Sequence, residues 1–151
     1  MTGVFLFGIF AAILSVAFYM FGARNQEKQI YKIIMVPKTI DNTNDFWTSL
    51  IAGAELGAEE FNTDLEVLGG KSEVDIDGQI KRIEEAIKKK PDVMLVAPCS
   101  YSETTEALQK VVDSGIKLIL IDSVIDKDIA QSVVATDNYL AGKQLGEFAR
   151  G

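Results

Sequence analysis

The chain of 151 residues has no histidine and one cysteine, and these absences exclude several kinds of site. Without histidine there is no Ser-His-Asp or Cys-His catalysis and no histidine-ligated metal. One cysteine forms neither an internal disulfide nor a cysteine-rich zinc site. Basic residues are also few, 15 against 22 acidic ones, which gives a formal net charge of −7. A nucleic-acid-binding protein needs clustered Lys and Arg to neutralise phosphates, so we expect no nucleic-acid partner.

Charged side chains are absent from residues 1–23, and residues 3–22 are almost wholly apolar. A helix of this length crosses the ~30 Å hydrocarbon core of a bilayer. We therefore predict a signal peptide or membrane anchor over residues 1–23 and a linker over residues 24–30. Phe21-Gly22-Ala23 lacks the small-residue pattern of a cleavage site, which favours an uncleaved anchor.

Short continuous apolar runs recur along residues 31–151. Such runs are typical of strands that are buried on both faces of a parallel sheet. The predicted strands cover residues 33–36, 65–68, 93–96, 116–121 and 133–135.

Between these runs, apolar residues recur every three or four positions, as on one face of a helix. The four predicted stripes are Phe46, Leu50, Ala54, Ala58 and Phe61; Ile76, Ile80, Ile83 and Ile87; Leu108, Val111 and Val112; and Leu140, Leu145 and Phe148. Asp45 is the predicted N-cap of the first helix. The run Lys88-Lys89-Lys90 suits the C-terminus of the second helix, so it needs no phosphate ligand.

The alternation of strands and helices predicts an α/β fold with a doubly wound parallel sheet in the flavodoxin-like order 2-1-3-4-5, with helices on both faces. Ligands of such sheets bind beyond the carboxyl ends of the strands, where the strand order reverses. The predicted site therefore lies among the loops over residues 38–47, 98–102, 122–126 and 136–138.

The first of these loops ends with an amide and two adjacent aromatic side chains, Asn44, Phe46 and Trp47. Aromatic rings stack on the apolar faces of a sugar, and amides and carboxylates bind its hydroxyls. The alternative is that Phe46 packs into the core and Trp47 is a surface aromatic.

Two later loops place acidic side chains at the same edge of the sheet. Asp122 comes directly after a buried strand and is followed by Ser123, and an ionised Asp there accepts hydrogen bonds from two hydroxyls. Asp137 follows the fifth strand and is a further candidate contact. The alternatives are an N-cap or turn role for Asp122 and a capping role for Asp137.

Together these residues resemble a known family. The matching positions are Asn44-Asp45-Phe46-Trp47, Ser49, Gly53-Ala54, Pro98, Leu120-Ile121-Asp122, Ala135-Thr136-Asp137-Asn138 and Ala141-Gly142. In order and spacing, residues 31–151 resemble the N-terminal lobe of type I periplasmic binding proteins, the ribose- and galactose-binding group to which the lactose-repressor sensor domains are related. The resemblance implies that Asn44, Phe46 and Trp47 contact the ligand and that Asp122 accepts its hydroxyls.

Two positions depart from the ribose-binding pattern. Those relatives have an Asn where this chain has Ala97, and an Arg where this chain has Ser123. An amide and a bidentate guanidinium are thus missing as hydrogen-bond donors. We expect a sugar other than ribose or a similar small polar ligand.

The resemblance also implies a second lobe that closes over the ligand, and this chain ends where that lobe would begin. We therefore expect a fragment of an extracytoplasmic solute-binding protein that serves the permease of an ABC transporter. The alternative is a membrane-anchored sensor subunit that reports to a histidine kinase. Both place residues 31–151 in the periplasm or at the outer face of the membrane. Arg24 and Lys28 follow the apolar run instead of preceding it, an arrangement that does not by itself favour export.

We expect neither catalysis nor a cofactor. The loop after the first strand has no glycine, so it lacks the phosphate-binding turn of a dinucleotide enzyme. Pro98-Cys99 stands where a phosphoacceptor domain needs an acidic residue. Cys99 has no histidine to activate it as a nucleophile.

Overall fold

A five-stranded parallel sheet organises the part of the chain that the computed structural model describes, residues 30–151. The predicted signal or anchor segment and the linker lie outside the described residues. Within residues 30–151, none of the helices is both long enough and apolar enough to cross a bilayer. The strands are β1 (Lys32–Val36), β2 (Asp64–Val67), β3 (Val93–Val96), β4 (Lys117–Ile121) and β5 (Ser132–Val134).

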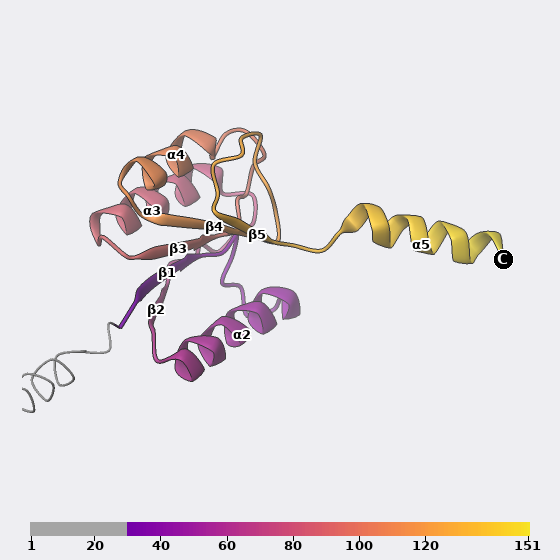
Figure 1. The fold of residues 1–151 in the computed structure, drawn as a ribbon, viewed down its shortest axis with the longest axis horizontal. Coiled ribbons are helices and arrows are strands. Elements are labelled where there is room, and N and C mark those ends of the chain that lie inside the picture. The colour runs from indigo at the N-terminus through magenta and orange to yellow at the C-terminus, as the bar shows by residue number, and fades with distance from the viewer. Residues whose placement is uncertain (1–29) are drawn as a thin grey trace, which may run out of the picture. The chain divides into compact units, whose positions relative to one another are not determined.

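The strand order is β2-β1-β3-β4-β5, and every neighbouring pair is parallel (Figure 1). This confirms the predicted order and the α/β class. Because the order reverses between β1 and β3, the connections that follow these two strands lead to opposite faces of the sheet, and ligands of such sheets bind at the carboxyl edge between them.

Within the described residues, four helices accompany the sheet: α2 (Asp45–Phe61), α3 (Ile76–Lys88), α4 (Thr105–Asp113) and α5 (Asn138–Arg150). Figure 1 shows α3 and α4 over one face of the sheet and α2 on the opposite face. Helices therefore lie on both faces, as predicted. The turn after α4 uses Gly115 at φ 77°, a conformation that costs glycine little.

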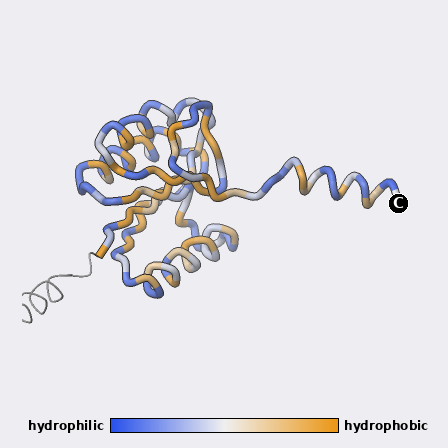
Figure 2. Tube along the Cα trace, viewed as in Figure 1, coloured by the Kyte–Doolittle hydropathy of each residue, from blue (hydrophilic) through white to orange (hydrophobic). Residues whose placement is uncertain are grey.

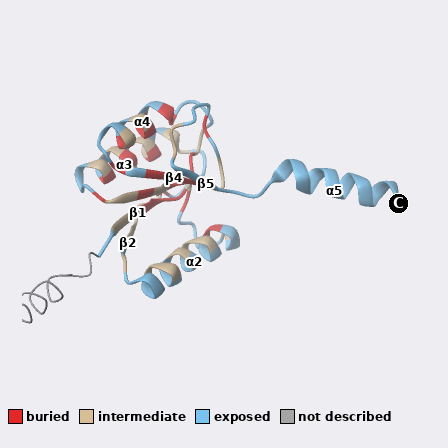
Figure 3. Cartoon of the chain, viewed as in Figure 1, coloured by how far each residue is buried: buried red, intermediate tan, exposed pale blue. Residues whose placement is uncertain are grey.

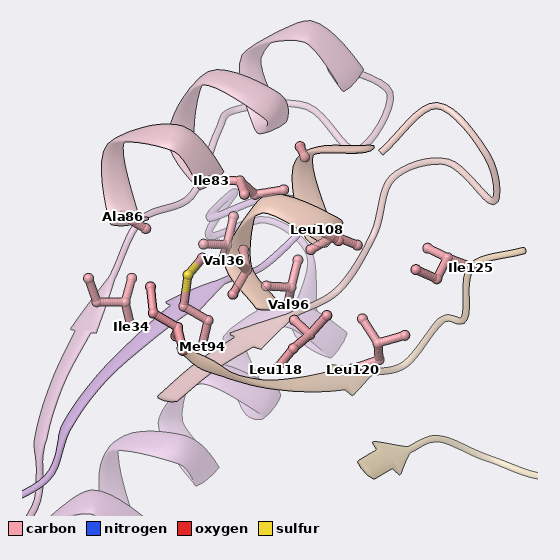
Figure 4. Close-up of a cluster of buried hydrophobic side chains, with 13 residues drawn as sticks. Ile34, Val36, Ile83, Ala86, Met94, Val96, Leu108, Leu118, Leu120 and Ile125 are labelled. Atoms are coloured by element: carbon pink, nitrogen blue, oxygen red, sulfur yellow. The ribbon is translucent and has the colours of Figure 1, made fainter. Parts of the chain in front are cut away.

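The main core lies between the sheet and helices α3 and α4 (Figure 4). Alternate strand residues point into it because successive side chains of a strand face opposite sides. Its fully or almost fully buried members include Ile34, Val36, Met94, Val96, Leu118 and Leu120 from strands and Ile83, Ala86, Leu108 and Val111 from helices.

Helix α2 corrects two expectations. Its N-cap is Asn44, not Asp45, because the Asn44 Oδ1 accepts hydrogen bonds from the backbone N–H groups of Phe46 (3.1 Å) and Trp47 (3.5 Å). Phe46 and Phe61 are exposed, and Trp47 is the one buried residue of this helix. Leu50, Ala54 and Ala58 of the predicted stripe are half-buried, but at its start Trp47 takes the place predicted for Phe46. Periodicity defines the spacing of a stripe but leaves its phase open when apolar residues stand next to each other.

Helix α5 is capped at its N-terminus by Asp137, whose carboxylate accepts a hydrogen bond from the Leu140 N–H at 2.8 Å. In Figure 1 it extends away from the sheet, and no residue of it is buried (Figure 3). The side chains of the predicted apolar stripe, Leu140, Leu145 and Phe148, are exposed. Figure 2 shows hydrophobic positions recurring along this helix. The prediction of a helix is confirmed, but the expectation that this stripe packs is wrong in this structure. The reason is geometric, since the link after β5 leads away from the sheet.

Candidate functional site

The loops after β1, β3, β4 and β5 meet in an open depression at the carboxyl edge of the sheet. It has a volume of about 440 Å³, which is within the range of small-molecule sites. Its lining includes Lys38, Pro98, Cys99, Tyr101, Asp122, Ser123, Thr136 and Asn138. Four loops far apart in the sequence thus form one surface, as the topology predicts.

Lys38 and Asp122 form an ion pair inside this depression. The Lys38 Nζ lies 2.9 Å from the Asp122 Oδ2 and donates a hydrogen bond to the Ser123 Oγ at 2.6 Å. The Ser123 hydroxyl in turn donates to Asp122 at 2.7 Å. The three side chains therefore present an ammonium donor, a carboxylate acceptor and a hydroxyl at one place. A sugar hydroxyl both donates and accepts, so it can bind this set with both functions.

Partial burial acts to raise the pKa of Asp122, but the hydrogen bonds from Lys38 and Ser123 and the charge of Lys38 outweigh it. The pKa of this carboxyl is held below its usual value of 3.8. Asp122 is thus an ionised acceptor at neutral pH.

The backbone of Asp122 is also unusual, with φ 64° in the left-handed region. A non-glycine residue adopts it rarely, although Asp tolerates it better than most. The Asp122 N–H donates to the carbonyl oxygen of Val134 at 2.9 Å, which holds this turn against β5. The geometry turns the carboxylate off the end of β4 toward β1 and Lys38. Such backbone strain is often found at binding sites.

A second group of contacts surrounds Trp47. Its indole Nε1 donates to the Glu73 Oε1 at 2.7 Å, and the Asn44 Nδ2 donates to the same oxygen at 2.8 Å. The Lys38 Nζ lies 5.9 Å from the centroid of the Trp47 ring, within the range of a cation–π interaction. Lys38 therefore joins this group to the Asp122 pair.

The two aromatic side chains have the opposite exposure from the alternative raised above. Trp47 is 2% exposed and Phe46 is 51% exposed, and their rings meet edge to face at 5.0 Å between centroids. The Trp47 side chain is therefore part of the protein interior, and the Phe46 ring is open to solvent.

The six predicted site residues thus occupy different environments. Asp122 and Ser123 line the depression together. Asn44 and Trp47 lie in the second group, bound to Glu73, and Phe46 packs on Trp47. Asp137 caps α5, which is the alternative given for it, and its neighbours Thr136 and Asn138 line the depression.

Lys38 and Glu73 are the residues that sequence reasoning missed. Lys38 stood in a predicted site loop, and a lone cation two residues after a buried strand was a usable signal. Glu73 belongs to the segment between β2 and α3, and no local pattern connects it with Trp47.

The thiol of Cys99 lies in the lining, where partial burial raises its pKa above the usual value despite the nearby cation of Lys38. It is therefore protonated at neutral pH. Within residues 30–151, no group of three or more Cys, Asp or Glu side chains is arranged to hold a metal ion.

Comparison with known proteins supplies a family and several relatives. A family model described as a periplasmic binding protein domain matches residues 33–150. The D-ribose/D-allose-binding protein of Pseudomonas aeruginosa is 26% identical over 125 residues, which are 78% of this chain and 39% of the relative. The multiple sugar-binding periplasmic receptor ChvE of Rhizobium radiobacter is 28% identical over 133 residues, 87% of this chain and 36% of the relative.

Solved structures agree with this match. A sugar transporter from Clostridium phytofermentans superposes with a TM-score of 0.74 at 46% identity, over 77% of this chain and 43% of the other. A carbohydrate transporter solute binding protein from Agrobacterium radiobacter, in complex with D-arabinose, has a TM-score of 0.72 at 26% identity, over 80% of this chain and 40% of the other. The chain thus spans well under half the length of these relatives.

Proposed function

The chain belongs to the periplasmic binding protein domain family, and on this premise we propose that residues 31–151 are the N-terminal lobe of an extracytoplasmic protein that binds a neutral sugar. The observation that carries the proposal is the arrangement of Lys38, Asp122 and Ser123 at the carboxyl edge of the sheet. The names of the relatives, which include a sugar-binding receptor and a solute binding protein with D-arabinose, support the ligand class.

The electrostatics favour a neutral ligand over an acidic one. Asp122 is ionised, and its charge is already balanced by Lys38. The carboxylate of an acidic ligand would therefore find Lys38 already paired and would be repelled by Asp122. The chain as a whole is also acidic, with a net charge of −7. A neutral hydroxyl is not repelled by Asp122. It can accept a hydrogen bond from Lys38 while it donates one to Asp122.

The remaining predicted contacts have distinct roles in this proposal. Phe46 offers its exposed ring for stacking on the apolar face of the sugar. Asn44 and Trp47 shape the wall behind Lys38, since their polar atoms are bound to Glu73. Asp137 places Thr136 and Asn138 at the rim through its cap on α5.

We further propose that residues 1–23 are a signal peptide or anchor, that residues 24–30 are a linker, and that the protein delivers sugar to the membrane permease of an ABC transporter. The similarity to a sugar transporter and to a carbohydrate transporter solute binding protein supports a role in transport. The predicted uncleaved anchor supports the alternative, a sensor subunit for a histidine kinase. In both cases the protein is a binder without catalysis, and a second lobe would close over the ligand. One lobe alone leaves the ligand partly in water, so we expect millimolar affinity from this chain.

The test is titration of the ¹⁵N-labelled chain, kept in a mild detergent, with D-ribose, D-allose and D-arabinose at millimolar concentrations. We expect at least one sugar to shift the backbone amide signals of Asp122, Ser123 and Thr136. Asp122→Asn should weaken this response about tenfold, because a neutral amide is a poorer acceptor than a carboxylate. The matched control is Asp128→Asn, since Asp128 is exposed in the same connection. Absence of any response, or equal responses in both variants, would reject the proposed site.

A further inference from the structure

Helix α3 has one fully buried polar side chain, Gln79. Its Nε2 donates a hydrogen bond to the Ala97 carbonyl oxygen at 2.8 Å, and its Oε1 accepts one from the Cys99 N–H at 2.8 Å. Glutamine is rarely buried completely, because an amide removed from water must recover its hydrogen bonds. Gln79 recovers them entirely from the segment that leaves β3.

That segment needs a partner for a reason that lies in its sequence. The Ala97 N–H donates to the Val36 carbonyl oxygen at 3.0 Å and is the last rung of the ladder toward β1. Pro98 faces the other neighbour, β4, and has no N–H to donate to it, so the sheet ladder of β3 ends here on both sides. The Ala97 carbonyl oxygen therefore needs a donor from outside the sheet, and the Cys99 N–H needs an acceptor. One carboxamide supplies both functions with the spacing of a backbone peptide group.

The same segment forms one wall of the depression. Pro98, Cys99 and Ser100 line it together with Asp122. At the far end, the fully buried Thr104 donates from its hydroxyl to the Ser100 carbonyl oxygen at 2.8 Å. Two buried polar side chains, one from α3 and one next to α4, thus hold the two ends of this wall.

We propose that Gln79 is a positioning residue for the sugar-binding depression, whose carboxamide holds residues 97–99 in the conformation that forms the wall. Gln79 does not line the depression and acts through this segment. The inference rests on the proposed function for the wall's role in sugar binding. The hydrogen bonds that carry it are independent of any ligand.

The first variant removes both hydrogen bonds while keeping the length of the side chain. In Gln79→Met, we expect hydrogen exchange of the Cys99 amide to accelerate about tenfold or more, because its buried acceptor is lost. The shifts induced by D-arabinose at Cys99 and Ser100 should require about tenfold more sugar. Gln144→Met is the matched control, because Gln144 is exposed on α5. The Leu118 amide of β4 reports any global loss of stability.

The second variant makes the contact depend on pH. In Gln79→Glu, a protonated carboxyl donates to the Ala97 oxygen and accepts from the Cys99 N–H, as the native amide does. The ionised form has no proton to donate, so a carboxylate oxygen of the introduced side chain would face the Ala97 carbonyl oxygen and repel it. Burial disfavours ionisation, so this transition should occur above the ordinary glutamate value of about 4.3. We expect native-like Cys99 exchange and D-arabinose response below the transition, and values like those of Gln79→Met above it.

A merely structural role predicts a different pattern. Gln79 would then stabilise the whole lobe, and the Leu118 and Cys99 amides would accelerate together in Gln79→Met. That result would overturn the inference, and so would unchanged exchange of the Cys99 amide in Gln79→Met. It would also be overturned if the sugar response of Gln79→Glu depended on pH no more than the response of Gln144→Glu does. If the native chain gives no response to D-arabinose, the proposed function fails for that sugar, and the exchange of Cys99 still decides whether Gln79 holds the wall.

Discussion

Lys38 and Asp122 are 84 residues apart in the sequence, yet the ammonium nitrogen of one lies 2.9 Å from the carboxylate of the other. Lys38 follows β1 and Asp122 follows β4, and the sheet order brings these two strand ends to the same edge. The pair stands between Trp47 and Ser123 and so connects the two halves of the candidate site. Most of the predictions below concern this pair and its surroundings.

Replacement of Lys38 by methionine should raise the pKa of Asp122. Without the hydrogen bond and charge of Lys38, partial burial is opposed only by the Ser123 hydroxyl. The change is measured by following the Asp122 carboxyl carbon in a ¹³C NMR titration. Lys117→Met is the control, because Lys117 is exposed at the start of β4. An Asp122 pKa that stays at its native value in Lys38→Met would show that the ion pair is absent in solution.

The stability of the lobe should depend on pH through Asp122. The folded pKa of this carboxyl lies below the ordinary value of 3.8, so its stabilising contribution is fully present above that value. The contribution is lost as the pH falls through the lowered folded pKa. Thermal unfolding of the native chain and of Asp122→Asn should therefore differ in Tm at pH 7 and converge in strongly acidic solution. A gap in Tm that stays constant down to pH 2 would contradict this assignment.

Replacement of Glu73 by alanine should increase the exposure of the Trp47 indole to water. The indole N–H loses its acceptor, and a buried donor without a partner costs about 1–3 kcal/mol, so the side chain should move toward water. Trp47 is the single tryptophan of the chain, and its fluorescence emission should shift to longer wavelength. Glu59→Gln, on the exposed side of α2, should leave the emission unchanged. An unshifted emission in Glu73→Ala would mean that the hydrogen bond does not hold the ring.

A cavity in the main core should strongly lower the free energy of unfolding. Leu108 of α4 is fully buried against the sheet, and Leu108→Ala should lower the free energy of unfolding by about 2–5 kcal/mol. Leu56 of α2 is 66% exposed, and Leu56→Ala should change it by less than about 0.5 kcal/mol. Denaturant unfolding measures both. Similar losses in the two variants would place the core elsewhere.

Much of the fold could be predicted from local patterns. Five apolar runs predicted five strands to within a residue or two at their ends, and their alternation with helices predicted the order β2-β1-β3-β4-β5. These features depend on the spacing of apolar residues along a short stretch and on the handedness of crossovers. Asp122 and Ser123 were found in the same way, because any residue directly after a buried strand reaches the carboxyl edge.

Local patterns were therefore enough to predict the class of fold, the edge of the sheet where the candidate site lies and Asp122 within it. The neighbours of each side chain became known from the folded arrangement. It placed Trp47 inside and Phe46 outside, because adjacent aromatics leave the phase of a helix open. It also paired Lys38 with Asp122 and Gln79 with residues 97–99. Such contacts join distant parts of the chain, and they depend on distances and directions that no local spacing contains.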